Sequence, residues 1–520
     1  MTATSSRSGL PRRSLGWGPL ALLAGVTVVF GAVGVLPRWP GLVHAVAIPP
    51  LDLAFDLRVL VARASSYPLF VIGALLSLAV RSLILAAVLG TLGSEELYRE
   101  RLFRAARFYL VVWIPVVFAA GLSFAALAAL YHWYYWAGLG ALLVASSVAA
   151  VRLPEQGLRF RGVLGYLFLL TAIGGLAGAA GRWGSVALVP VSAALTLAVL
   201  GNRPRRWRKP LASAASVLAV VSCVNAAMLG LLGAVSFGGA RPTIQPEAVA
   251  LFLVPGVDTS SGHGALYQLD PATLGFSCDR VFYYSYLGTG PGAPRGDARC
   301  PIRVHAPYGQ ADTQLPIDQL SNAFAEQIDA IRQTMDGSPI VVVTHSQGNL
   351  IAWRAISSGS SSAVSHLVML AGFAENPAPY PARGQDGSGR VGGDVLRGLT
   401  GLSRRMGIGT FDPDAALARQ ILATAGGAQA ILSERLPSHV QALTVEATLD
   451  APLSSGGRSV RGALDGGKVD ATHVGLVTSA RTGDIIRRFL AGEQPEGRAT
   501  PLGVLLEWIT PAFGSPRYGA

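Results

Sequence analysis

The sequence predicts two parts of different fold class, an N-terminal all-α transmembrane bundle and a C-terminal α/β domain. Apolar runs of helix length fill the first 240 residues, whereas the later residues alternate between short apolar strands and amphipathic helices. A mean hydropathy of +0.44, with 51% hydrophobic residues, is typical of a chain with a large membrane part. At 520 residues the chain is long enough for both.

The net charge of +12 belongs to the apolar part. Residues 1–240 hold 20 Lys and Arg against 6 Asp and Glu, a charge of +14, and the remainder holds 22 against 24, a charge of −2. The arginines lie between apolar runs rather than on one folded face, so we expect no nucleic-acid partner.

Seven apolar runs approach the length of about 20 residues that a membrane-spanning helix needs. They are Trp17–Leu36, Leu69–Leu92, Phe108–Leu130, Trp136–Val151, Val163–Ala180, Val186–Leu200 and Leu211–Phe237. The fourth and sixth are short, which leaves six spans as the alternative to about seven. The first run exceeds the ~7–15 apolar residues of a signal-peptide core, so we expect it to be retained as a span.

Arginine distribution orients these spans. Alternate connections are arginine-rich, at 99–107, 152–161 and 203–209, and the connections between them carry few basic residues. Positive charge is enriched in cytoplasmic loops. We therefore expect an integral plasma-membrane protein with a cytoplasmic N-terminus and, after an odd number of spans, an extracytoplasmic C-terminal domain. Arg81 would lie mid-span, facing a neighbouring helix or extending to the membrane surface.

Two of the three cysteines, Cys278 and Cys300, lie in the C-terminal part. Outside the cytoplasm they can persist as a disulfide. Closing the loop of 22 residues between them would contribute about 3 kcal/mol on the chain-entropy model. Two unrelated thiols are the alternative.

Domain boundaries follow from composition. We expect a transmembrane domain at 1–240, a linker at 241–247, the α/β domain at 248–492 and a Pro/Gly-rich tail at 493–520. Strands are predicted at 249–254, 281–287, 340–343, 366–370 and 440–449, and amphipathic helices at 317–331 and 476–490. The segment at about 374–438 begins Pro/Gly-rich and is expected to form a cap inserted above the site.

The stretch that follows the strand 340–343 carries the strongest chemical signal. Four β-branched residues lead into Thr344-His345-Ser346-Gln347-Gly348, and a helical pattern begins directly afterwards. A strand that turns sharply into a helix exposes the middle side chain of the turn, here Ser346. The pattern is that of a G-x-S-x-G nucleophile elbow, with Thr344 at the position of the first glycine.

The partners that a serine nucleophile needs follow in the expected chain order. The order is Ser, then an acid after a late strand, then a His before the last helix. Asp450 ends the predicted strand at 440–449, and His473 precedes the closing helix. Asp465, Asp470 and Glu375 remain alternatives for the acid.

Two backbone amides are expected to bind the oxyanion that forms when the serine attacks. The elbow supplies the amide of Gln347, and the loop after the first strand supplies that of Val257. Gly256 would let this loop approach the elbow closely. His345 is expected to be structural, because neighbouring side chains at an elbow point apart.

These segments resemble a known family. Val343-Thr344-His345-Ser346-Gln347-Gly348 is similar to the nucleophile turn of α/β-hydrolase lipases. Asp450 and Thr472-His473-Val474-Gly475-Leu476 resemble the acid and H-x-G-L segments of the small bacterial triacylglycerol lipases, which tolerate a residue other than glycine at the first elbow position. The resemblance covers roughly 248–490. The segment 374–438 departs from the small lipases.

The resemblance implies an α/β-hydrolase fold, with a mostly parallel sheet, helices on both faces and a cap insertion. It also implies a carboxylic ester hydrolase of the lipase or esterase type, without metal or organic cofactor. Ser346 would be the nucleophile, His473 the general base and acid, and Asp450 its orienting group, with Val257 and Gln347 as oxyanion donors.

The expected function is thus a membrane-anchored serine hydrolase acting on lipid or cell-envelope esters. An acyltransferase or thioesterase with the same triad is an alternative. A third hypothesis, from a different class, is a membrane transporter or sensor whose hydrolase-like domain only binds.

Overall fold

The computed structural model describes residues 51–91, 97–110, 248–359, 361–372, 379–407, 409–450, 460–495, 497 and 499–500. Of the seven expected spans, only Leu69–Leu92 lies largely within these ranges. The linker at 241–247 and the other spans, apart from the first residues of the third, lie outside the described residues.

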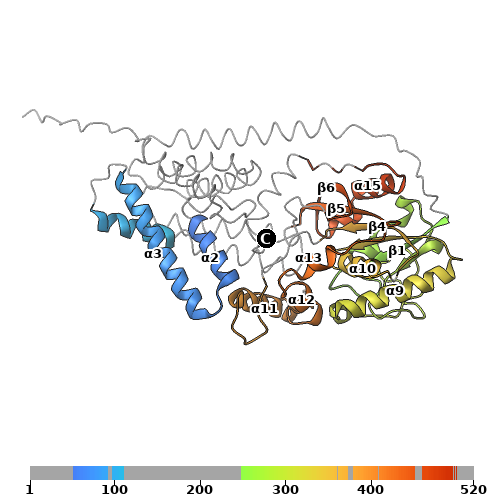
Figure 1. The fold of residues 1–520 in the computed structure, drawn as a ribbon, viewed down its shortest axis with the longest axis horizontal. Coiled ribbons are helices and arrows are strands. Elements are labelled where there is room, and N and C mark those ends of the chain that lie inside the picture. Colours follow the sequence, from blue (N-terminus) through green and yellow to red (C-terminus); the bar gives the residue numbers. More distant parts are fainter. Residues whose placement is uncertain are drawn as a thin grey trace, which may run out of the picture.

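A six-stranded, all-parallel sheet forms the centre of the C-terminal part (Figure 1). Its strand order is β2-β1-β3-β4-β5-β6. The strands are β1 Ala250–Val254, β2 Val281–Tyr283, β3 Ile340–His345, β4 Val364–Leu370, β5 Gln441–Leu449 and β6 Leu464–Thr472. The strands β1 and β3 are buried along their whole length, because helices cover both faces of the sheet.

Helices pack on each face. One face carries α9 Ile317–Thr334, α10 Gly348–Ser357, α12 Ala416–Ile421 and α13 Gly427–Leu432. The other carries α14 Gly475–Thr478, α15 Ala480–Leu490 and the short 3-10 helices η4 Ala265–Gln268 and η5 Pro271–Leu274. Two more 3-10 helices, η6 Cys278–Arg280 and η7 Gln310–Gln314, lie in loops. This arrangement is consistent with the α/β-hydrolase fold.

Most predicted elements of this part match β1–β5, α9 and α15 within a few residues, with three differences. The strand expected at 281–287 ends early, since the backbone of Ser285 leaves the sheet and its N–H donates to Gln327 Oε1 at 2.8 Å. The closing helix divides at Ser479, whose backbone is extended. The strand β6 was not predicted, because glycines and charged residues obscure its alternation.

The expected cap segment carries α11 Arg390–Arg405 together with α12 and α13, among its described residues 379–407 and 409–438. Figure 1 shows α11 between the sheet and the N-terminal helices. The cap is therefore the part of the domain that meets the N-terminal part.

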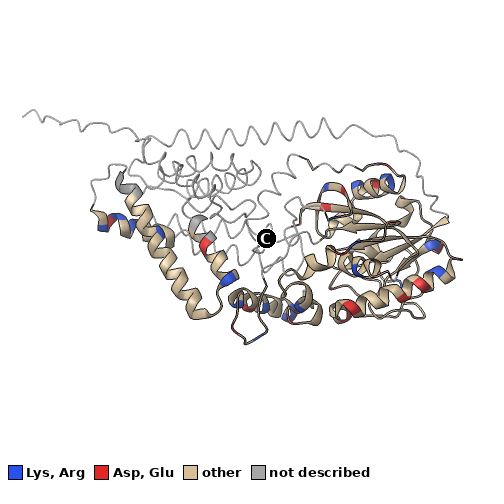
Figure 2. Cartoon of the chain, in the orientation of Figure 1, with Lys and Arg blue, Asp and Glu red and all other residues tan. Residues whose placement is uncertain are grey.

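The N-terminal described residues form a hairpin of α2 Leu51–Arg63 and α3 Tyr67–Thr91, followed by a helix at 98–110. In α3, residues Tyr67–Ala87 are long and apolar enough to cross a membrane, and only 17% of the most apolar window is buried. Figure 2 shows α3 almost without charged residues. The helix α2 was not predicted; its residues were expected to form an extramembrane connection.

The helix α2 provides the partner of Arg81. Arg81 Nε and Nη2 donate to the two carboxylate oxygens of Asp56, each at 2.9 Å. The two side chains are mostly buried, at 17% and 23% exposure. Of the two expected positions for Arg81, the structure therefore has the one that faces a neighbouring helix.

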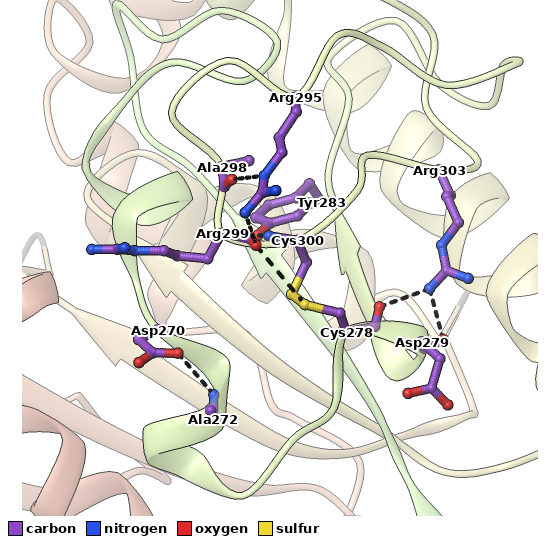
Figure 3. Close-up of a disulfide and its surroundings, with 10 residues drawn as sticks. All are labelled: Asp270, Ala272, Cys278, Asp279, Tyr283, Arg295, Ala298, Arg299, Cys300 and Arg303. Carbon is purple, nitrogen blue, oxygen red and sulfur yellow. Dashed lines mark hydrogen bonds between the residues drawn. A yellow bond between two sulfur atoms is a disulfide. The ribbon is translucent and has the colours of Figure 1, made fainter.

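The structure joins Cys278 and Cys300 in a disulfide, with 5.2 Å between their Cα atoms (Figure 3). It lies beside the outer strand β2, where the N–H of Cys300 donates to Tyr283 Oη at 3.2 Å. The Arg303 guanidinium donates to the carbonyl oxygen of Cys278 at 2.9 Å. The bridge thus fastens a long loop to the edge of the sheet.

Candidate active site

The turn from β3 into α10 places Ser346 at the carboxyl end of the sheet. Ser346 has a φ of +57°, a left-handed conformation that non-glycine residues rarely adopt. Its N–H donates to the carbonyl oxygen of Leu370 in the neighbouring strand at 3.0 Å. At Gly348, a Cβ would lie 2.5 Å from the carbonyl oxygen of Val254, so only glycine fits there. This is the backbone of a nucleophile elbow.

Thr344 occupies the position of the first glycine. Its side chain is fully buried between β3 and β4, and its hydroxyl lies 3.1 Å from the carbonyl oxygen of Val368. The same hydroxyl contacts the amide oxygen of Asn349, whose Nδ2 donates to Leu370 O at 3.0 Å. The threonine therefore binds the elbow to the adjacent strand.

The loop after β1 lies directly against the serine. A Cβ on Gly256 would lie 2.9 Å from the Cβ of Ser346 and 3.4 Å from its Oγ. A residue with a side chain would push the two segments apart. The absence of a side chain thus lets the loop that carries Val257 lie close to the turn of Ser346 and Gln347.

His473 and Asp450 form a buried pair. Their side chains are 5% and 3% exposed, and His473 Nδ1 lies 2.7 Å from Asp450 Oδ2. Because a carboxylate only accepts, Nδ1 carries the hydrogen, and in the neutral ring Nε2 is then the proton acceptor. His473 Nε2 is buried and has no hydrogen-bond partner among the described residues.

Two of the three other candidate acids bind backbone N–H groups instead of His473. Asp465 Oδ1 accepts the N–H of Gly467 at 2.8 Å, and Asp470 Oδ2 accepts the N–H of Thr500 at 2.8 Å. Both side chains belong to β6. Glu375 lies outside the described residues. Only Asp450 among the described candidates contacts His473.

His345, expected to be structural, contacts the residue that carries the candidate base. Its Nε2–H donates to the backbone carbonyl of His473 at 2.9 Å, and the two imidazole centroids are 4.6 Å apart. Burial, reinforced by the adjacent His473 ring, lowers the pKa of His345 to about 3. His345 is therefore neutral at neutral pH and holds the His473 loop against the elbow.

The structure brings the five predicted site residues to one end of the sheet, but Ser346 and His473 are not hydrogen-bonded to each other. No hydrogen bond joins Ser346 Oγ to His473 Nε2 in the described part of the chain. Catalytic hydrogen bonds are often long without substrate and tighten when it binds. Ser346 is 5% exposed and His473 4%, so the site is covered in this conformation.

A cap loop that the sequence did not place lies against the loop that follows β1. The backbone N–H of Thr410 donates to Asp258 Oδ1 at 2.8 Å, next to Val257 in the chain. Gln314 accepts the N–H of Asp412 at 2.6 Å and donates to the carbonyl oxygen of Thr410 at 3.1 Å. These partners are separated by about a hundred residues or more, and no motif marks them.

A second Ser–His pair lies in the same domain. Ser261 Oγ lies 2.8 Å from His305 Nε2, and His305 Nδ1 donates to the carbonyl oxygen of Tyr283 at 3.0 Å. The N–H of Tyr308 donates to Ser261 Oγ at 2.8 Å. This pair has a backbone carbonyl where a triad has a carboxylate, and its serine is not on an elbow. It connects loops.

Among the described residues, no group of three or more His, Cys, Asp or Glu side chains is arranged to hold a metal ion.

No protein-family model matches the chain, and no curated protein matches it in sequence. Several solved structures are similar. Phospholipase PlaB from Legionella pneumophila, in complex with thio-NAD, is 15% identical over 38% of this chain and 37% of its own, with a TM-score of 0.24. The chain thus spans less than two fifths of the length of this phospholipase.

Two further structures match more of their own length. Lipase B from Aspergillus fumigatus is 14% identical over 55% of this chain and 69% of its own, with a TM-score of 0.27. RedJ, a thioesterase from the prodiginine biosynthetic pathway of Streptomyces coelicolor, is 17% identical over 50% and 96%, with a TM-score of 0.24. With sequence identities and TM-scores this low, these structures do not indicate the activity of this chain.

Proposed function

We propose that the chain is a membrane-anchored serine hydrolase that cleaves carboxylic esters of lipids or of the cell envelope. The observation that carries the proposal is the buried Asp450–His473 pair beside a left-handed serine turn. A serine hydroxyl is a weak nucleophile until a base takes its proton and a third group orients that base. Ser346, His473 and Asp450 fit these three roles.

The proposed reaction has two halves. In the first, Ser346 Oγ attacks the ester carbonyl carbon while His473 Nε2 takes its proton. The tetrahedral intermediate then expels the alcohol, which receives that proton from His473, and an acyl-serine remains. In the second, His473 takes a proton from water, whose oxygen attacks the acyl carbon. Collapse returns the proton to Ser346 and releases the carboxylic acid.

The negative charge of each tetrahedral intermediate lies on the former carbonyl oxygen. We assign its stabilisation to the backbone N–H groups of Gln347 and Val257, since Gly256 holds the loop of Val257 against the serine. Asp450 keeps the hydrogen of His473 on Nδ1 and stabilises the imidazolium that forms in each half.

Membrane attachment is supported by α3, the one candidate span among the described residues. Tethering at a bilayer raises the local concentration of amphiphilic substrates. The remaining spans and the extracytoplasmic location of the hydrolase domain follow from the apolar runs and the arginine distribution of the sequence.

Fluorophosphonate labelling of the purified full chain tests the proposal. We expect the wild type to be labelled and Ser346→Ala to be unlabelled, with ester hydrolysis reduced by about 10⁴-fold or more. Ser261→Ala is the matched control, because it removes the serine of the other Ser–His pair, and it should retain labelling.

Failure of the folded wild type to react would overturn the enzyme proposal and favour a binding domain. Loss of labelling in Ser261→Ala, with Ser346→Ala still labelled, would show that Ser261 and not Ser346 is the nucleophile. If labelling occurs as expected, the ratio of hydrolysis to transfer onto an added alcohol or thiol distinguishes a hydrolase from an acyltransferase.

A further inference from the structure

The cap helix α11 has its polar and apolar faces reversed relative to an ordinary surface helix. After Val391 in its first turn, its buried side chains are polar: Arg397, Thr400 and Ser403, each less than a tenth exposed. Its outward side chains include Val395, Leu402 and Met406, which are 43%, 53% and 62% exposed. With Leu399, these residues recur at intervals of four, three and four, which places them on one side of a helix. We call these four residues the apolar stripe.

The inward polar face has partners that explain its orientation. Arg397 donates to both carboxylate oxygens of Asp414, at 2.7 and 2.8 Å, and to Asp394 Oδ1 at 2.8 Å. It also donates to the carbonyl oxygen of Pro381 at 2.7 Å, and its guanidinium lies 5.5 Å from the ring centroid of Tyr380. These contacts fix the rotation of the helix, and with it the outward direction of the apolar stripe.

The same helix is attached to the end of the candidate span. Tyr67, the first residue of α3, donates from its hydroxyl to Asp394 Oδ2 at 3.0 Å. Just before α11, the N–H of Gly387 donates to the carbonyl oxygen of Ser65 at 3.1 Å. Figure 1 shows α11 beside the lower end of the α2–α3 hairpin, between it and α12. If α3 crosses a bilayer, Tyr67 marks its boundary, where tyrosine rings favour the headgroup layer.

We propose that α11 lies on the surface of the bilayer that α3 crosses, with the apolar stripe in contact with lipid. Helices in this position insert their apolar side about 5–10 Å, to the boundary between headgroups and acyl chains. Arg405, exposed in the last turn, would reach lipid phosphates.

Lipid is favoured as the occupant because the stripe lies on a helix that is joined to the end of an apolar candidate span. The outward side chains of α3 near the same end are apolar and about half exposed or more: Leu69, Val71, Ile72 and Leu75. The hydrogen bond between Tyr67 and Asp394 joins the two helices. The inference rests on the proposed membrane span and not on hydrolase activity.

Fluorescence quenching in a bilayer tests this position. In the full chain with Cys223→Ser, a bimane label is attached at Leu402→Cys or, separately, at Met406→Cys. The native disulfide occupies the other two cysteines. The protein is reconstituted in vesicles of phosphatidylcholine and phosphatidylglycerol, with or without doxyl-labelled lipid. Leu287→Cys is the matched control, a leucine 48% exposed in a loop of the hydrolase domain.

We expect doxyl lipid to remove most of the fluorescence at both stripe positions and little at Leu287→Cys, and iodide to give the opposite ranking. Strong iodide quenching at the stripe would show that it faces water and would overturn the proposal. Protection from both quenchers would show that protein, from this chain or a second copy, covers the stripe, and would overturn it equally. Because the readout is not catalytic, an inactive enzyme with a lipid-quenched label would contradict only the proposed function.

Discussion

His473 is held at two of its atoms by groups from different parts of the chain. Asp450, at the end of β5, binds the side-chain Nδ1, and His345, at the end of β3, binds the backbone carbonyl. The first contact fixes the tautomer of the ring, and the second fixes the loop that carries it. Nε2 is left as the atom that can receive a proton.

Replacing Asp450 with asparagine should lower kcat by about 10⁴-fold, as expected when the acid of a triad loses its charge and the preferred tautomer of the base is lost. Asp465→Asn and Asp470→Asn are the matched controls, since both bind backbone N–H groups instead. Hydrolysis of p-nitrophenyl esters by the purified variants measures the effect. Near-normal turnover in Asp450→Asn would refute the assignment of the acid.

His345 should make stability dependent on pH. Its pKa is about 3 in the folded chain and about 6.5 when unfolded, so the unfolded state binds the extra proton between these values. The resulting stability is complete above pH 6.5 and is lost as the pH falls toward 3, by about 1 kcal/mol per pH unit. His345→Gln keeps an N–H donor but does not titrate, so its stability should fall less steeply.

Thermal unfolding in detergent, followed by tryptophan fluorescence across this range, measures the two slopes. Burial also lowers the pKa of His305, which contributes to both proteins and cancels in the comparison. Parallel slopes for wild type and His345→Gln would show that His345 is not held neutral by the fold.

At the scale of elements, the sequence predicted those whose signal is local. The strand β3 begins with a run of β-branched residues and α9 repeats its apolar residues at helical spacing, so both could be placed to within three residues. Chain order favoured Asp450 as the acid but left three alternatives open, because the sequence does not give the direction in which each carboxylate side chain points. In β6, Gly466 and Gly467 interrupt the alternation that identifies a strand.

The contacts of the cap could not be predicted from the sequence for a different reason. Asp258 and Thr410 are 152 residues apart, and neither belongs to a motif. The same cap loop is bound to α11 by the ion pair between Arg397 and Asp414, just before α12. The hydrogen bonds from Arg397 lower the pKa of Asp414, so this pair stays ionised at neutral pH.

Substituting Arg397 with methionine should therefore loosen the cap. The side chain of Arg397 is 4% exposed, and removing one member of a buried ion pair typically costs about 3–5 kcal/mol. Arg404→Met is the control on the same helix, because its pair with Asp412 is more than a third exposed and should contribute about 1 kcal/mol or less. Chymotryptic cleavage within 379–414, mapped by mass spectrometry, should accelerate only in Arg397→Met. Equal cleavage of the two variants would show that the ion pairs do not hold the cap.

For the whole molecule, the contacts of the α2–α3 turn relate the hydrolase domain to the membrane. The cap meets the hairpin at Ser65 and Tyr67, which lie at one end of the candidate span. The helix at 98–110 follows the other end. A chain that crosses the bilayer once between them must place the hydrolase domain and the helix at 98–110 on opposite sides.

Accessibility of single cysteines in intact cells should show this asymmetry. With Cys223→Ser as background, Leu287→Cys reports on the hydrolase domain and Phe103→Cys on the helix at 98–110; the native side chains are 48% and 65% exposed. The arginines at 99, 101, 104 and 107 favour a cytoplasmic position for that helix. A membrane-impermeant maleimide should therefore label Leu287→Cys in intact cells and Phe103→Cys only after permeabilisation. The reverse result would invert the orientation but keep the span, whereas labelling of both in intact cells would show that α3 does not separate them.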